Sequence, residues 1–202
     1  MRKQLVLIGG IAGSGKSTVA DYISKGYPYV YVDKDDVTST LMEELLVVFN
    51  QPFYDRESII YVEKIRPFEY KQFLETSFHI LENNYVVSAA PFLKEFQDIQ
   101  WILDLNSKVT SSKNELIIIW VDAEPIETKD RLIQRGEKRD EYKLAHFDEY
   151  EQSMLTVRSN ITNTLSIIKE QYNIKVHIID NFNGSIEDTF DKIDVLIYNI
   201  ND

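Results

Sequence analysis

Short apolar runs alternate with longer amphipathic segments along the whole chain. The apolar runs predict strands at 4–9, 29–32, 85–89, 115–121 and 175–179. Apolar residues at helical spacing predict helices at 16–25, 35–49, 56–82, 94–105, 125–135, 148–171 and 185–198, with a turn at 181–184. Strands that alternate with helices are typical of a parallel sheet covered on both faces. The pattern therefore predicts an α/β domain of three layers, α/β/α, around a five-stranded parallel sheet.

The sequence GIAGSGKS at residues 10–17 lies between the first predicted strand and the first predicted helix, and it matches the pattern GxxxxGK(S/T). Glycine backbones in such a loop allow consecutive N–H groups to point at a phosphate. We expect Lys16 to reach the β- and γ-phosphates of ATP, and Ser17 to bind Mg²⁺ through its hydroxyl. The expected nucleotide contacts are Gly10, Gly13, Ser14, Gly15, Lys16, Ser17 and Thr18.

Carboxylates follow the second predicted strand, at the edge of the sheet where the phosphate-binding loop would lie. Transfer of a phosphoryl group to a hydroxyl needs a group that orients the hydroxyl and accepts its proton, and we expect Asp35 in that role. Asp33 would hold the Mg²⁺ shell through water, and it is also the second candidate for the base. As an alternative, Asp35 or Asp36 caps the following helix and has no chemical role.

Basic residues gather in and after the helix predicted at 125–135. Arg131 and Arg135 are four residues apart and so on one helix face, and Arg139 follows in a polar segment. Fixed guanidinium donors suit a transferring phosphate or the adenine ring, so we expect Arg131 and Arg135 to be catalytic and Arg131 also to contact the nucleotide. The alternative is a solvated helix end. From the position of the last strand, Asn181 is expected to border the base.

Composition narrows the class of protein. The chain has 202 residues, a hydrophobic content of 44% and no linker, which favours a single domain over 1–202. The net charge of −11 argues against a polynucleotide partner. The sequence contains no cysteine and no apolar run that could cross a bilayer, and we expect a cytoplasmic protein that does not use a membrane.

The chain resembles the P-loop small-molecule kinases, a group that includes polynucleotide 5′-hydroxyl kinases, zeta toxins, chloramphenicol phosphotransferase and gluconate kinase. The residues that carry the resemblance are the loop at 10–17, the segment VDKDDV at 32–37 with Leu41 and Met42, and the arginines at 131, 135 and 139. The resemblance implies that Asp35 is the general base and that residues of about 131–147 form a lid. It also implies a P-loop fold with the strand order 2-3-1-4-5.

The chain departs from the polynucleotide kinases at Thr38, where they carry an arginine for the substrate's phosphate. The leading hypothesis is therefore an ATP-dependent kinase that transfers the γ-phosphoryl group to a hydroxyl of a small molecule. A polynucleotide or nucleotide kinase is one alternative. A nucleotide-dependent binding module or switch without kinase activity is another. The identity of the acceptor, the preference for ATP over GTP and the oligomeric state are open at this point.

Overall fold

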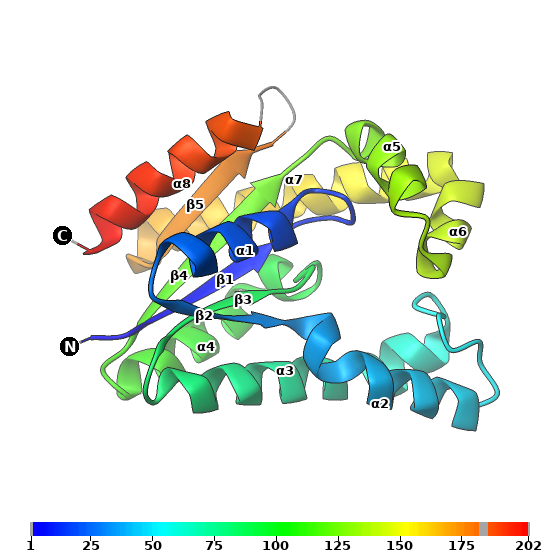
Figure 1. The fold of residues 1–202 in the computed structure, drawn as a ribbon, viewed down its shortest axis with the longest axis horizontal. Coiled ribbons are helices and arrows are strands. Elements are labelled where there is room, and N and C mark those ends of the chain that lie inside the picture. Colours follow the sequence, from blue (N-terminus) through cyan, green and yellow to red (C-terminus); the bar gives the residue numbers. More distant parts are fainter. Residues whose placement is uncertain (1, 182–185, 202) are drawn as a thin grey trace.

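A parallel sheet forms the middle layer of the molecule (Figure 1). Within residues 2–181 and 186–201, which the computed structural model describes, the sheet has five strands in the order β2-β3-β1-β4-β5. The strands are β1 (Gln4–Gly9), β2 (Tyr29–Asp33), β3 (Tyr85–Ala89), β4 (Glu115–Asp122) and β5 (Lys175–Asp180). Each neighbouring pair is parallel. The predicted three-layer class and strand order are confirmed.

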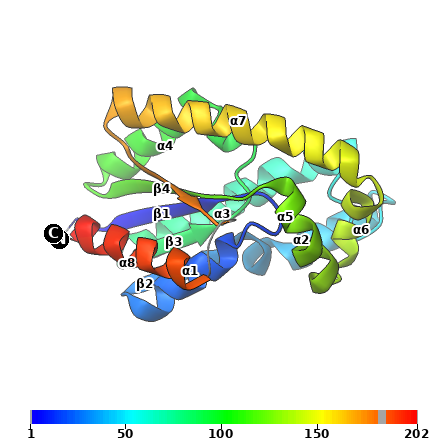
Figure 2. The same cartoon turned by 90° about the horizontal axis from the view of Figure 1, so that it is seen from above.

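Helices cover both faces of this sheet. They are α1 (Lys16–Gly26), α2 (Lys34–Val48), α3 (Arg66–Leu81), α4 (Ile99–Ser111), α5 (Pro125–Arg135), α6 (Lys138–Ala145), α7 (Phe147–Tyr172) and α8 (Ile186–Asn201). Figure 2 shows α4 and α7 on one side of the sheet and α1 and α8 on the other. Side chains alternate accordingly along β1, because successive residues of a strand point to opposite faces. Leu5 and Leu7 pack with α3, α4 and α7, whereas Val6 and Ile8 pack with α1 and α8.

The carboxyl ends of the strands lie at one edge of the sheet and position the candidate site. In the register of the sheet Ile8 pairs with Ala89, Asp33 also pairs with Ala89, and Asp122 pairs with Asp180. The loop after β1, the start of α2 and the start of α5 therefore meet at this edge. Ligands of open α/β sheets bind at such an edge.

Several predicted helix boundaries are wrong. The helix predicted at 56–82 is a loop, then a π-helix at Tyr61–Ile65, then α3, and Pro67 begins α3 where no N–H is needed. The helix predicted from residue 94 is a 3₁₀ turn at Glu95–Gln97 followed by α4. The polar segment after residue 135, for which no helix was predicted, contains α6. The predicted turn at 182–184 lies outside the described residues.

A buried ion pair joins α2 to α3. Nζ of Lys34 lies 2.8 Å from Oε1 of Glu69, and both side chains are almost fully buried. The other carboxylate oxygen of Glu69 accepts a hydrogen bond of 2.7 Å from the Tyr61 hydroxyl, and Thr38 donates to Oε1 at 3.1 Å. Burial of two charges is costly unless they are paired and hydrogen-bonded, and here both carboxylate oxygens of Glu69 and the ammonium of Lys34 have partners. The pair fixes the helix that carries Asp35 against the wall formed by α3.

We expect Glu69→Ala to lower the free energy of unfolding by about 3–5 kcal/mol, because it removes the buried partner of the Lys34 ammonium and leaves only the more exposed carboxylate of Asp35. The matched control is Asp21→Ala, which removes the partner of Lys25 in an exposed ion pair of α1. An exposed pair contributes about 1 kcal/mol or less. Urea denaturation of both variants measures the difference, and equal losses in the two variants would contradict the role given to the buried pair.

Candidate functional site

The loop between β1 and α1 has the backbone shape expected from its glycines. Gly13 and Gly15 adopt positive φ of 78° and 93°, which other residues adopt only with strain. A Cβ on Gly13 would also lie 2.9 Å from Cβ of Thr128. The N–H of Gly10 donates to the carbonyl of Pro91 at 3.3 Å, and the N–H of Ser14 donates to that of Ile11 at 3.1 Å. The loop is thus a compact turn held against the segment after β3.

The N-terminus of α1 is open to an anion. It has no side-chain cap and no acidic residue in its first turn, so the end of the helix dipole meets no negative charge of its own. The start of α2 differs, because the Asp33 carboxylate accepts a hydrogen bond of 2.8 Å from the N–H of Asp35. Lys16 and Ser17 line a cavity at the open N-terminus, whereas Thr18 is exposed in the first turn of α1. This is the arrangement that binds phosphate groups at helix ends.

Arg131 and Asn181 support the loop from outside the cavity. The guanidinium of Arg131 donates to the carbonyl of Gly13 at 3.0 Å and to that of Asn181 at 3.2 Å. The side-chain amide of Asn181 donates to the carbonyl of Ser14 at 2.6 Å and accepts from the Thr189 hydroxyl. Arg135 lines the cavity, whereas Arg131 contacts the loop, and the catalytic role expected of Arg131 stays a prediction. Contacts of Arg131 and Asn181 with a bound nucleotide stay predictions.

Asp33 and Ser17 face each other across the carboxyl edge of the sheet. Oγ of Ser17 lies 3.4 Å from Oδ2 of Asp33, which also accepts a hydrogen bond of 2.7 Å from the Tyr31 hydroxyl. Because Asp33 caps α2, the alternative that Asp35 or Asp36 is the cap is wrong. The hydroxyl and carboxylate oxygens are the kind of donor that Mg²⁺ prefers, so these residues fit the predicted metal site.

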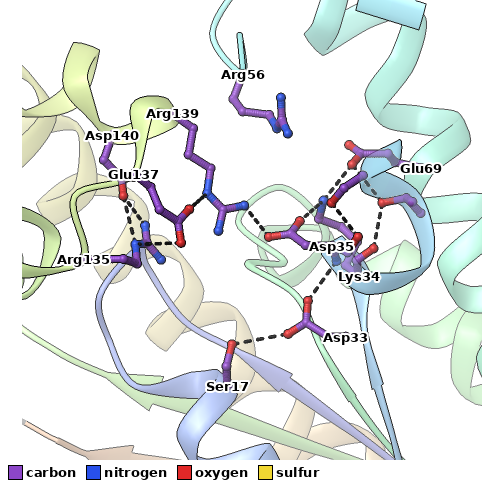
Figure 3. Close-up of polar contacts among 12 residues, drawn as sticks. Ser17, Asp33, Lys34, Asp35, Arg56, Glu69, Arg135, Glu137, Arg139 and Asp140 are labelled. Carbon is purple, nitrogen blue, oxygen red and sulfur yellow. Dashed lines mark hydrogen bonds and ion pairs between the residues drawn. The ribbon is translucent and has the colours of Figure 1, made fainter. Parts of the chain in front are cut away.

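Asp35 lies between two cations that come from different elements (Figure 3). Its Oδ1 is 2.8 Å from Nζ of Lys34, and its Oδ2 accepts a hydrogen bond from Arg139 of α6. Burial disfavours the charged form of Asp35, but the charges and hydrogen bonds of Lys34 and Arg139 outweigh burial and hold the pKa of this carboxyl well below its usual range. Asp35 is therefore ionised at any pH at which the protein would be assayed.

The arginines of α5 and α6 are oriented by neighbouring acids. Arg135 donates two hydrogen bonds to the buried carboxylate of Asp140, one of them through Nε at 3.0 Å. Arg139 forms an ion pair with Glu137 in addition to its contact with Asp35. Figure 3 shows Arg135 and Arg139 on the opposite side of the site from Lys34 and Glu69. Positive charge thus faces the loop and Asp35 from the segment predicted to be a lid.

A cavity of about 460 Å³ connects these parts. Its lining includes Lys16 and Ser17 from the loop, Asp33 and Asp35 from the start of α2, and Arg135, Arg139 and Tyr150 from α5, α6 and α7. The lining also includes residues from other segments, namely Arg56, Tyr61, Val62, Arg66, Tyr70, Leu93 and Met154. The volume is within the range of small-molecule sites.

Sequence reasoning missed part of this lining. Glu69 and Tyr61 support Lys34 from positions far along the chain, and Arg56 lies in a loop without a motif. The surrounding basic residues indicated Arg139, but no sequence pattern indicated its contact with Asp35. Tyr150 of α7 also lines the cavity and carried no sequence signal. These residues are recognised only when the fold brings them together.

A family model described as an AAA domain matches residues 5–156, and the chain belongs to this family. No curated protein sequence matches the chain. Among solved structures, a "putative kinase" from Chloroflexus aurantiacus J-10-fl is similar, with a TM-score of 0.56, 14% identity, and coverage of 91% of this chain and 90% of that one.

A second similar structure comes from the PezAT chromosomal toxin–antitoxin system of Streptococcus pneumoniae, with a TM-score of 0.59 and 14% identity. That match covers 89% of this chain and 68% of the other. The predicted resemblance to P-loop kinase-like proteins is confirmed at the level of family and fold. In the described residues, no helix combines the length and apolar character needed to span a membrane.

The pKa of Lys16 is lower than usual in the ligand-free protein. Burial, together with the charges of Arg135 and Arg139, lowers its pKa to about 8 against the opposing effect of Asp35 and Asp33. At pH 8.5 a sizeable fraction of the Lys16 side chain is therefore the neutral amine. A bound triphosphate favours the ammonium form, so binding raises the pKa of Lys16 and takes up a proton.

We expect nucleotide binding at pH 8.5 to be accompanied by uptake of a sizeable fraction of one proton. Isothermal titration calorimetry in buffers of different ionisation enthalpy measures this uptake. Lys16→Arg keeps a cation that does not titrate in this range and should bind without uptake, whereas Lys25→Met, an exposed position of α1, should behave like the wild type. Equal proton uptake by the wild type and Lys16→Arg would contradict the assignment.

Proposed function

We propose that the protein is an ATP-dependent kinase that transfers the γ-phosphoryl group to a hydroxyl of a small-molecule acceptor. One observation carries the proposal: a single cavity is lined by the phosphate-binding loop, by Asp35 and by the arginines of α5 and α6. Phosphoryl transfer to a hydroxyl needs these three components at one place. The membership of the family and the kinase-like fold support the same class of reaction.

In the proposed reaction the hydroxyl oxygen of the acceptor forms a bond to the γ-phosphorus, while the bond from that phosphorus to the β–γ bridging oxygen breaks. The proton of the hydroxyl passes to Asp35 and the products are ADP and the phosphorylated acceptor. Lys16, Arg135 and Arg139 stabilise negative charge on the transferring group. Arg139 would then exchange part of its contact with Asp35 for the phosphate, which frees a carboxylate oxygen to orient the hydroxyl.

Ser17 and Asp33 are the residues proposed to hold Mg²⁺, Ser17 directly and Asp33 through water. The described part of the chain holds no cluster of three or more His, Cys, Asp or Glu residues suited to a metal ion. The remaining ligands would therefore be phosphate oxygens and water, which is the usual way that Mg²⁺ binds with a nucleotide. When bound, Mg²⁺ neutralises charge on the phosphate oxygens.

The alternatives make different demands on the cavity. A polynucleotide acceptor needs an electrostatic field that attracts a polyanion, and the net charge of −11 opposes it. A binding module without catalysis would not need the Asp35 carboxylate to line the same cavity as Lys16. Both considerations favour a small acceptor and a transfer reaction. A cytoplasmic location stays a prediction from the sequence.

We expect Asp35→Asn to lower kcat for phosphoryl transfer by about 10²-fold or more while the affinity for ATP changes little, because the amide cannot accept the proton. Asp36→Asn is the matched control, since Asp36 is the exposed neighbouring aspartate of the same helix turn. Transfer from labelled ATP, measured across a panel of hydroxyl compounds, supplies kcat, and nucleotide titration supplies the affinity. Full activity of Asp35→Asn would remove Asp35 from the mechanism.

A further inference from the structure

Arg56 lines the cavity with its charge incompletely balanced. Its neighbour in the wall, Arg66, forms a bidentate pair with Glu95 in which both N–O distances are 2.8 Å. The side chain of Arg56 is only 11% exposed, yet the carboxylate it approaches, Glu43, lies 3.8 Å from Nη2 and is 40% exposed. An ion pair of this length at the surface compensates a buried guanidinium poorly.

The hydrogen bonds of Arg56 leave part of its guanidinium free. Nη1 donates to the carbonyls of Phe53 at 3.2 Å and Asp55 at 3.1 Å, which fixes the orientation of the group. In the described part of the chain, Nε and Nη2 have no hydrogen-bond acceptor. The carboxylate of nearby Asp55 is itself engaged by the N–H groups of Glu57 and Ser58. A planar guanidinium with free donors is suited to bind a carboxylate or phosphate.

The position of Arg56 assigns these donors to the acceptor rather than to ATP. Arg56 lines the same cavity as Asp35 and Arg139, and Figure 3 draws no hydrogen bond or ion pair from Arg56 to the other residues shown. The triphosphate end of the cavity is supplied with cations by Lys16 and Arg135. An acceptor whose hydroxyl lies at Asp35 extends from there into the region lined by Arg56.

We propose that the acceptor carries an anionic group, a phosphate or a carboxylate, and that Arg56 binds this group. The inference deepens the proposed kinase function and rests on it for the reaction, but the anion site itself can be tested without transfer. Arg56 also lies 5.5 Å above the ring of Tyr61, which with Val62, Leu93 and Met154 offers apolar contact to the carbon skeleton of the acceptor. Because the chain as a whole is acidic, such a site would select anions locally rather than by long-range attraction.

The test measures binding to protein saturated with Mg²⁺ and the non-hydrolysable analogue AMP-PNP, so that the triphosphate site is filled and no transfer can occur. The probes in isothermal titration calorimetry are inorganic phosphate, glucose 6-phosphate and glucuronate, with glucose as the neutral comparison. We expect at least one anionic probe to bind the wild type more tightly than glucose does. A preference for glucose 6-phosphate over glucuronate assigns the site to phosphate, and the reverse order assigns it to carboxylate.

Arg56→Gln should lower the affinity for the preferred anionic probe about tenfold or more, as expected for the loss of hydrogen bonds to a charged partner. Arg56→Lys keeps the charge but not the planar guanidinium, so its affinity for the probe should lie between those of the wild type and Arg56→Gln. Arg2→Gln, at an exposed position before β1, is the matched control and should bind like the wild type. Unchanged affinity for AMP-PNP shows that the variants are folded, and Arg56→Lys carries the comparison if Arg56→Gln loses that affinity.

The inference is overturned if none of the three anions binds the wild type more tightly than glucose, or if the Arg56 variants bind them as the wild type does. These outcomes are independent of the Asp35→Asn experiment, because AMP-PNP cannot donate its terminal phosphoryl group in this assay. If the protein binds the anions through Arg56 but transfers no phosphoryl group, the proposed anion site stands and the proposed kinase function fails. If the Arg56→Gln variant transfers phosphoryl groups to neutral acceptors with full activity, the proposed kinase function stands and the proposed anion site fails.

Discussion

The contact of Asp35 with Arg139 is the interaction on which the arrangement of the site depends. It joins the start of α2 to α6, two segments more than 100 residues apart in the chain, and it spans the cavity beside the phosphate-binding loop. The second oxygen of Asp35 is held by Lys34, which Glu69 anchors to α3. One carboxylate therefore connects α2, and through Lys34 and Glu69 also α3, to α6. Because both partners are cations, this carboxylate stays ionised.

A bound triphosphate would compete with Asp35 for the same arginine. The γ-phosphate and Asp35 are both anions, and Arg139 cannot give its full set of hydrogen bonds to both at once. In the proposed reaction this competition releases the Asp35 carboxylate, which becomes available to the acceptor hydroxyl when the donor phosphate is bound. Lys34 keeps Asp35 in place during this exchange, because its own position is fixed by Glu69 rather than by the ligand. The buried pair thus belongs to the site through its hold on Asp35.

The sheet and the phosphate-binding loop could be predicted from the sequence because each depends on local pattern, namely apolar runs and the fixed spacing of glycines and Lys16. Asp35 was identified through its place after β2 and through the resemblance. The segment α6 was missed, since KRDEYKLA at 138–145 has too few apolar residues for a helical period. The contact partners of Asp35 and Arg56 come from distant parts of the chain. The local spacing of residues therefore cannot predict them. For the same reason the contact of Arg131 could not be predicted. Arg131 shares α5 with Arg135, but its guanidinium donates to the carbonyl of Gly13.

The central claim is that the cavity transfers the terminal phosphoryl group of ATP to an added hydroxyl. The most direct measurement follows ATP labelled at the γ-phosphate during turnover with a panel of hydroxyl compounds that includes anionic and neutral members. We predict that one acceptor accelerates ADP formation and that the label is recovered in that acceptor as a phosphate monoester. Label found only in inorganic phosphate, at a rate that no acceptor changes, would contradict the claim.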